Sequence, residues 1–164
     1  MQDMTDAQKS RIYLALAAAL LLLTAGMAWK FIIAGSTERA EDGRLAVLVT
    51  SQERAMMLSE MRDFVTGLQS ISDALAREDM RGVAAAARAM GSAKTKGEPS
   101  ALMGKLPIEF KVLGLGVHRD FDAIALDAER LGQTRHTLGQ LAAALQKCAA
   151  CHASFQVKAT DSQN

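Results

Sequence analysis

Residues 138–155 read LGQLAAALQKCAACHASF and carry most of the information about the fold. Their apolar, cysteine and histidine positions recur in steps of three and four residues, which return to one face of an α-helix. The stripe consists of Leu138, Leu141, Leu145, Cys148, His152 and Phe155. The spacing predicts a last helix on which a cysteine and a histidine share the buried face with core leucines.

The stretch CAACH at residues 148–152 is a C-x-x-C-H motif, the attachment signature of a c-type haem. In that chemistry the two thiols add to the vinyl groups of the porphyrin, and the histidine provides the proximal nitrogen of the iron. Residues three and four apart lie on one helix face, so all three side chains can reach one macrocycle. The motif predicts one covalent haem c, with Cys148 and Cys151 as thioether residues and His152 as the proximal iron ligand.

Two other chemistries use the same residue types. A zinc site normally has four ligands, and the chain offers no second Cys/His pair beside its two cysteines. A thioredoxin-like dithiol accompanies a βαβ pattern, which the sequence lacks. Haem attachment is therefore favoured over zinc binding and over dithiol chemistry.

The composition favours helices and excludes some classes of function. Hydrophobic residues make up 49% of the 164 residues but aromatic residues only 4%, and Pro occurs twice. Ala, Leu and Met supply most of the apolar surface, and they favour helices over sheets. The net charge of +1 argues against a nucleic-acid-binding protein. No acid–base pair, nucleophile–base set or phosphate-binding loop indicates an enzyme.

Residues 12–34 form a long apolar segment near the N-terminus. About 20 apolar residues span a bilayer as a helix. Trp29 and Lys30 are residue types that suit the membrane–water interface. The segment predicts a transmembrane anchor, with residues 1–11 as a cytoplasmic N-terminus.

A signal peptide is the alternative interpretation of the same segment. Lys9 and Arg11 would form its positively charged region, with cleavage after Ala28. The apolar run is longer than the usual core of a signal peptide, so we favour a retained, uncleaved segment.

Four amphipathic segments with short connections follow: residues 44–76, 79–90, 107–131 and the segment that contains the C-x-x-C-H motif. Asp79 predicts an N-cap for the second of them. We predict an all-α fold, an antiparallel four-helix bundle at residues 44–158 that carries the haem and is preceded by one transmembrane helix. Residues 35–43 are expected to be a linker and residues 159–164 a tail.

The chain resembles the class II cytochromes c, the family of cytochrome c′ and its low-spin relatives. The resemblance covers about residues 44–158 and rests first on CAACH near the end of an all-helical chain, with Phe155 three residues after the histidine. It also rests on MRDFVTGLQSISDALAREDMRGVAAAARAM at residues 61–90 and LPIEFKVLGLGVHRDFDAI at residues 106–124. The chain departs from the family in having Gln156, where a basic residue is frequent, and Phe155, where tyrosine is frequent.

The resemblance implies a choice of distal iron ligand. In low-spin members a methionine of the first bundle helix binds the iron, whereas in cytochrome c′ that position is open or covered by an apolar side chain. The resemblance favours Met61, with Met57 and Met56 as alternatives, although a methionine at helical spacing is commonly core filler. His118 lies about 100° from the centre of its stripe and is expected to be partly exposed. His136 is about four turns from the motif, too far to reach the same iron.

The resemblance also implies a location, because c-type haem is attached outside the cytoplasm. We expect a single-pass inner-membrane protein with its haem domain in the periplasm, carrying single electrons between redox partner proteins at that membrane. The alternatives are a five-coordinate binder of nitric oxide or carbon monoxide, like cytochrome c′, and an accessory haem subunit of a membrane complex. A homodimer is left open.

Overall fold

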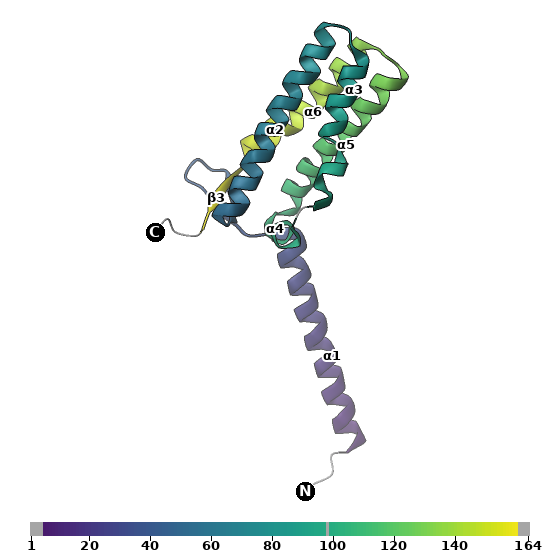
Figure 1. Cartoon of the computed structure of the whole chain (residues 1–164). Helices are drawn as coiled ribbons and strands as arrows, with labels where there is room; N and C mark the ends of the chain where they lie inside the picture. The colour runs from purple at the N-terminus through teal and green to yellow at the C-terminus, as the bar shows by residue number, and fades with distance from the viewer. Residues whose placement is uncertain (1–4, 98, 161–164) are drawn as a thin grey trace.

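The computed structural model describes residues 5–97 and 99–160 (Figure 1). The chain is mostly helical, at 78%, as the composition predicts. The elements in chain order are α1 (Asp6–Ala28), the π-helical segment η1 (Trp29–Ala34), β1 (Thr37–Arg39), β2 (Leu45–Val49), α2 (Ser51–Ala76), α3 (Met80–Ala89), the 3₁₀ segment η2 (Ser92–Gly97), α4 (Ser100–Lys105), α5 (Ile108–Arg130), α6 (Thr134–Ser154) and β3 (Phe155–Ala159). Residues 1–4 of the expected N-terminus and residues 161–164 of the expected tail lie outside the described residues.

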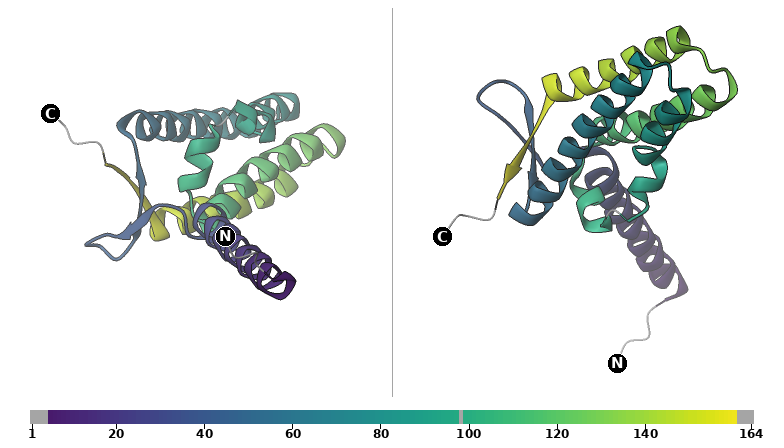
Figure 2. Two further views of the ribbon diagram at one scale, coloured as in Figure 1. Left: turned by 90° about the horizontal axis from the view of Figure 1, so that it is seen from below. Right: turned by 45° about the horizontal axis from the view of Figure 1, so that its top comes forward.

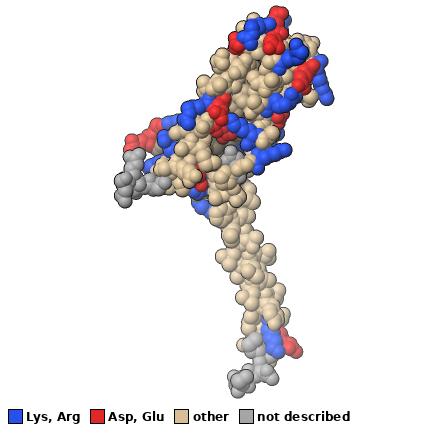
Figure 3. Space-filling view, in the orientation of Figure 1, with Lys and Arg blue, Asp and Glu red and all other residues tan. Residues whose placement is uncertain are grey.

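Helix α1 projects from the rest of the chain, and η1 connects it to the part that contains α4 and α5 (Figures 1 and 3). No residue of α1 is buried, and the most apolar part of residues 6–34 has a mean hydropathy of 2.0. By length and composition this helix is able to cross a membrane. It begins earlier than residue 12 because Asp6, in its first turn, is favourably placed at a helix N-terminus.

A three-stranded sheet occupies the place where the first bundle helix was expected to begin. Strand β2 pairs antiparallel with β1 and parallel with β3, with Leu45 opposite Phe155 and Val49 opposite Ala159. The predicted helix at residues 44–49 is therefore wrong, and so is the placement of Phe155 on the last helix. The nearby strand β1 pairs with one edge of β2, and the distant strand β3 pairs with the other, a contact that local spacing does not reveal.

Side-chain caps explain where two of the helices begin. The Thr50 hydroxyl accepts a hydrogen bond from the Glu53 backbone N–H at 3.2 Å, and the Glu53 carboxylate accepts one from the Thr50 N–H at 2.7 Å. This capping box begins α2. The Asp79 carboxylate accepts a hydrogen bond from the Gly82 N–H at 3.0 Å, which confirms the predicted N-cap of α3.

Helices α2, α3, α5 and α6 pack in chain order and alternate in direction (Figures 1 and 2). Their shared core, called the main core below, consists of Ile71, Ala74, Leu75, Val83, Ala84, Ala87, Met90, Val117, Phe121, Ile124, Ala125, Ala128 and Leu141. The short helix α4, which the sequence did not predict, lies beside η1 and β2. It contributes to a second core, called the sheet-side core, that consists of Val47, Val49, Leu102, Leu106 and Phe155.

Helix α6 presents a different face to the core from the one predicted. Leu138 and Leu145 are 50% and 41% exposed, and His152 is exposed as well. The residues that turn inward are Thr137, Leu141, Ala144, Cys148 and Cys151. These positions also recur in steps of three and four, and their smaller side chains permit close packing on α5. The predicted burial of His152 with the core leucines is therefore wrong, whereas the inward position of Cys148 is confirmed.

Candidate functional site

The two cysteines lie near the C-terminal end of α6 and contact different cores. Both are free thiols of intermediate exposure. Cys148 packs against the main core, and Cys151 packs against the sheet-side core. Residues three apart on a helix point in similar directions but lie nearly one turn apart along the axis, so the two cysteines of α6 reach different cores. The motif therefore bridges the two cores.

Burial raises the pKa of both thiols. The nearby Asp120 carboxylate adds to the effect at Cys148, and Cys148 adds to it at Cys151. A redox-active dithiol needs a thiolate, which a lowered pKa provides. The surroundings of these two residues therefore favour neutral thiols and do not resemble those of a dithiol oxidoreductase.

His152 lies on the exposed side of the same helix turn. Its backbone carbonyl accepts a hydrogen bond from Arg44 Nη1 at 3.3 Å, and the Phe155 carbonyl accepts from the same nitrogen at 3.4 Å. Arg44 thereby ties the end of α6 to the start of β2. Within residues 5–97 and 99–160, no group of three or more His, Cys, Asp or Glu side chains is gathered around one metal position.

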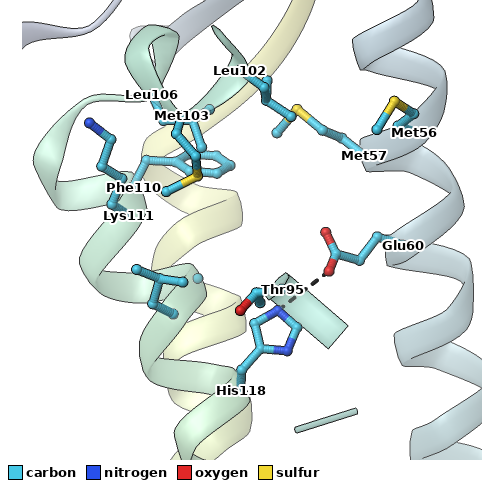
Figure 4. Close-up of a pocket in the computed structure, with 12 residues that line it drawn as sticks. Met56, Met57, Glu60, Thr95, Leu102, Met103, Leu106, Phe110, Lys111 and His118 are labelled. Atoms are coloured by element: carbon cyan, nitrogen blue, oxygen red, sulfur yellow. Dashed lines mark ion pairs between the residues drawn. The ribbon is translucent and has the colours of Figure 1, made fainter. Parts of the chain in front are cut away.

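A cavity of about 200 Å³ lies between α2, α4 and α5 (Figure 4). Its lining residues are Met56, Met57, Glu60, Thr95, Leu102, Met103, Leu106, Phe110, Lys111, Gly114, Leu115 and His118. Methionine, leucine and phenylalanine side chains form one end, and the Glu60–His118 pair forms the other (Figure 4). Cofactor and ligand sites are mostly apolar with a few polar groups, as this cavity is, but they usually have a volume of about 300–1,000 Å³.

The cavity and the C-x-x-C-H motif share part of their surroundings. Five lining residues belong to or pack on the sheet-side core that also holds Cys151, namely Met57, Leu102, Met103, Leu106 and Phe110. The rings of Phe110 and Phe155 meet edge to face at 5.4 Å, which joins the cavity wall to the residue that follows the motif. The second thiol therefore lies against the same apolar cluster as the cavity wall.

The predicted distal methionines are divided between two positions. Met56 and Met57 line the cavity, whereas Met61 is half-buried on α2 and does not line it. Met57 also packs on the same core as Cys151. Met103 lines the cavity too, and sequence reasoning missed it because α4 is too short to show a periodic pattern.

His118 is buried, at 5% exposed, which corrects the expected partial exposure. Its Nδ1 lies 2.7 Å from the Met90 carbonyl oxygen and its Nε2 lies 3.3 Å from Glu60 Oε1. Burial by itself would lower the pKa of His118, but the hydrogen bonds to Glu60 and Met90 outweigh it and raise the pKa. A protonated ring donates to both acceptors, so this pair links α5 to α2 at the polar end of the cavity.

The residues present fit a covalent haem in two respects. The thiols are reduced, inward-facing and spaced to hold one macrocycle. An apolar cavity with thioether sulfurs lies next to the core that holds Cys151. The histidine of the motif, His152, is exposed, so its side chain does not face the cavity.

His136 makes a separate contact at the other end of α6. Its Nε2 lies 3.0 Å from Asp127 Oδ2, and this hydrogen bond lowers the pKa of the Asp127 carboxyl. The contact places His136 beside a carboxylate near the surface, apart from the C-x-x-C-H motif.

Comparisons of the chain with protein-family models, with curated proteins and with solved structures found no match.

Proposed function

We propose that the chain is a single-haem c-type cytochrome that carries one electron at a time and is held at a membrane by α1. The observation that carries the proposal is the C-x-x-C-H motif at the end of α6, with both thiols turned inward and Cys151 packed on the apolar core that forms part of the cavity wall. When bound, the haem iron would supply the one-electron chemistry. The chain would supply attachment, axial ligands and protection from water.

The residues proposed to hold the haem have separate tasks. Cys148 and Cys151 would form the thioether bonds, and His152 would bind the iron on the proximal side. Contacts favour Met57 as the distal ligand, because it lines the cavity and packs on the same core as Cys151. Met61 and Met56 are the other distal candidates. Met103 and Phe110 would exclude water from this part of the cavity.

The arrangement of the helices supports a four-helix bundle as the haem-binding unit. Helix α2 packs on α3, α3 on α5 and α5 on α6, and the cavity separates α2 from the start of α5. A space between helices of a bundle is a common place for a cofactor. The proposal includes a periplasmic location for this unit and redox partners at the inner membrane, because c-type haem is attached outside the cytoplasm.

The test is an optical and chemical analysis of the full-length protein, made in cells that attach c-type haem and purified in detergent. If the proposal is correct, haem stays with the polypeptide after denaturation in the parent and is lost in Cys148→Ser plus Cys151→Ser. The reduced parent then has sharp α and β bands that carbon monoxide does not change. A polypeptide that retains no haem would refute the proposal.

Three matched variants identify the distal ligand. Met57→Ala is expected to broaden the reduced bands and permit carbon monoxide binding, whereas Met61→Ala and the more exposed Met56→Ala leave the spectrum unchanged. A change confined to Met61→Ala would move the ligand to that residue. A parent spectrum that is already high-spin and binds carbon monoxide would replace electron transfer with the gas-binding function. A haem protein that purifies only with other membrane subunits would support the accessory-subunit alternative.

A further inference from the structure

The junction between α1 and the rest of the chain is built from close backbone contacts. Gly35 has φ +65°, and its N–H donates to the Lys30 carbonyl at 2.9 Å while Lys30 Nζ donates to the Gly35 carbonyl at 2.6 Å. The Ser36 N–H donates to the Lys105 carbonyl at 2.7 Å. A Cβ added to Gly35 would lie 2.5 Å from the Lys105 carbonyl oxygen and 2.6 Å from the Pro107 nitrogen. Gly35 and Ser36, the first residues of the expected linker, are thus in close contact with the corner where α4 ends and α5 begins.

Both helices of this corner also hold the last turn of the anchor. Lys111 Nζ of α5 donates to the Phe31 carbonyl at 3.0 Å and to the Ile32 carbonyl at 3.2 Å. A cation is favourable there because carbonyls at a helix C-terminus carry partial negative charge. The Phe31 ring lies against α4, where a Cβ added to Gly104 would be 3.3 Å from Phe31 Cδ1. The end of the anchor therefore has fixed neighbours on two elements.

The length of the apolar segment sets the depth of this corner. Arg11 is the last charged residue before the segment, and about 20 helical residues cross the hydrocarbon of a bilayer. A span that begins after Arg11 ends close to Phe31, so Phe31 and Ile32 lie at the membrane–water boundary. Since Lys111 and Gly104 contact these residues, the α4–α5 corner lies at the same depth.

The side chains around the junction suit that depth. Trp29, Phe31 and Ile32 are exposed, and Val112, which follows Lys111 on α5, is 58% exposed. Apolar and aromatic side chains beside lysines are the combination found at the membrane interface. Each of these four apolar side chains is more than half exposed.

Resting on the proposed membrane anchor, we propose that the α4–α5 corner docks on the lipid surface from which α1 emerges. The bilayer is the partner: Val112 and Phe31 contact the upper acyl chains, and Lys111 lies among the headgroups. The globular part is then held in one orientation and does not swing on a tether. Leu102 and Met103 of α4 and Lys111 of α5 line the cavity, so the docked corner forms the wall of the cavity that faces the membrane.

Photo-crosslinking of the full chain tests this contact without using its thiols or haem. The full-length protein is reconstituted in vesicles of phosphatidylethanolamine and phosphatidylglycerol with Val112→benzoylphenylalanine. The illuminated ketone takes a hydrogen atom from a neighbouring C–H group and the two radicals combine, so a lipid adduct has the summed mass of protein and lipid. Leu126→benzoylphenylalanine, on an exposed residue of the same helix, is the matched control, and Leu22→benzoylphenylalanine reports on the anchor itself.

Lipid adducts at positions 22 and 112, with none above background at 126, are the expected result. Adducts at 22 but not at 112, or equal yields at 112 and 126, would overturn the docked orientation without contradicting the membrane anchor. No adduct at 22 would overturn the anchor, and the docking with it.

Junction variants separate fixed docking from mere proximity. Gly35→Ala is expected to abolish the adduct at 112 while the adduct at 22 remains, because the added Cβ strikes backbone atoms of the corner. Gly43→Ala is its control, since Gly43 also has a left-handed φ of +87° but an added Cβ meets nothing within 4 Å. Lys111→Met, which keeps the apolar stem, is expected to lower the yield at 112. Retention of the full yield in both Gly35→Ala and Lys111→Met, with helical circular dichroism unchanged, would overturn the fixed junction.

Discussion

Glu60 Oε1 lies 3.3 Å from His118 Nε2, and this contact connects α2 to α5 across one end of the cavity. The other ring nitrogen of His118 is held by the Met90 carbonyl at 2.7 Å, so the imidazole is fixed from both sides. A buried histidine with two acceptors is satisfied only when it is protonated. The contact makes the joining of these two helices dependent on pH.

The stability of the chain is predicted to fall as pH rises through the neutral range. The folded pKa of His118 is raised above the ordinary value of 6.5, so its stabilising contribution is complete below that value and is lost as pH rises through the raised pKa. A hydrogen bond to a charged group contributes about 1.5–3 kcal/mol. Urea unfolding followed by circular dichroism from about pH 5.5 to about pH 8.5 measures the slope.

Glu60→Gln is the variant that isolates this pair. It keeps the shape of the side chain but removes the charge, so the pH dependence should flatten and the acid-side stability should fall. The control is Asp127→Asn, which removes the acceptor of the surface residue His136. An equal flattening in both variants would assign the pH dependence to general charge effects.

Ile124→Ala is predicted to destabilise the chain by about 2–5 kcal/mol, because truncation of a fully buried side chain leaves a cavity in the core. Ile124 has 0% exposure in the main core, to which α2, α3, α5 and α6 all contribute. Leu126→Ala on the same helix is the matched control, since Leu126 is 41% exposed. The free energy of unfolding in urea measures both, and similar losses would contradict the described orientation of α5.

Thr50→Ala is predicted to cost about 1 kcal/mol of stability through loss of the capping box at the start of α2. Thr66→Ala is the control, because Thr66 lies exposed inside the same helix and its hydroxyl donates to the Arg62 carbonyl. Alanine is also the better helix former at that interior position. A thermal melt should therefore show a lower midpoint for Thr50→Ala alone.

The thiols of the haem-free chain are predicted to react slowly with iodoacetamide at neutral pH. Burial raises the pKa of Cys148 and Cys151, which lowers the fraction of reactive thiolate. Alkylation followed by mass spectrometry should be faster in urea, where both residues are exposed, and faster at alkaline pH. Rapid modification of the folded chain at neutral pH would instead favour the dithiol interpretation.

Some elements of the fold were accessible from the sequence because their causes are local. The apolar run that forms α1, the Asp79 cap of α3 and the position of the C-x-x-C-H motif each depend on neighbouring residues. Within the amphipathic segment predicted at residues 107–131, Phe121, Ile124 and Ala128 recur in steps of three and four and so share one helix face, and all three are buried.

Other features depended on contacts between distant segments. Residues 45–49 pair on one edge with β3, more than 100 residues later in the chain, and Phe155 leaves the helix to join this pairing. The inward face of α6 holds Thr137 and Ala144 in place of Leu138 and Leu145, because close packing on α5 favours the smaller side chains. Periodicity predicted a helix there but did not determine its rotation.

The sequence by itself therefore determined the helical class, the long apolar N-terminal helix and the C-x-x-C-H motif, all of which follow from residue type and short-range spacing. Only the tertiary structure decided that Met57 lines the cavity, that His118 is buried against Glu60 and that Lys111 binds backbone carbonyls of η1. Each of these depends on the packing of one element against another, which is set by the whole core and not by neighbours in the chain.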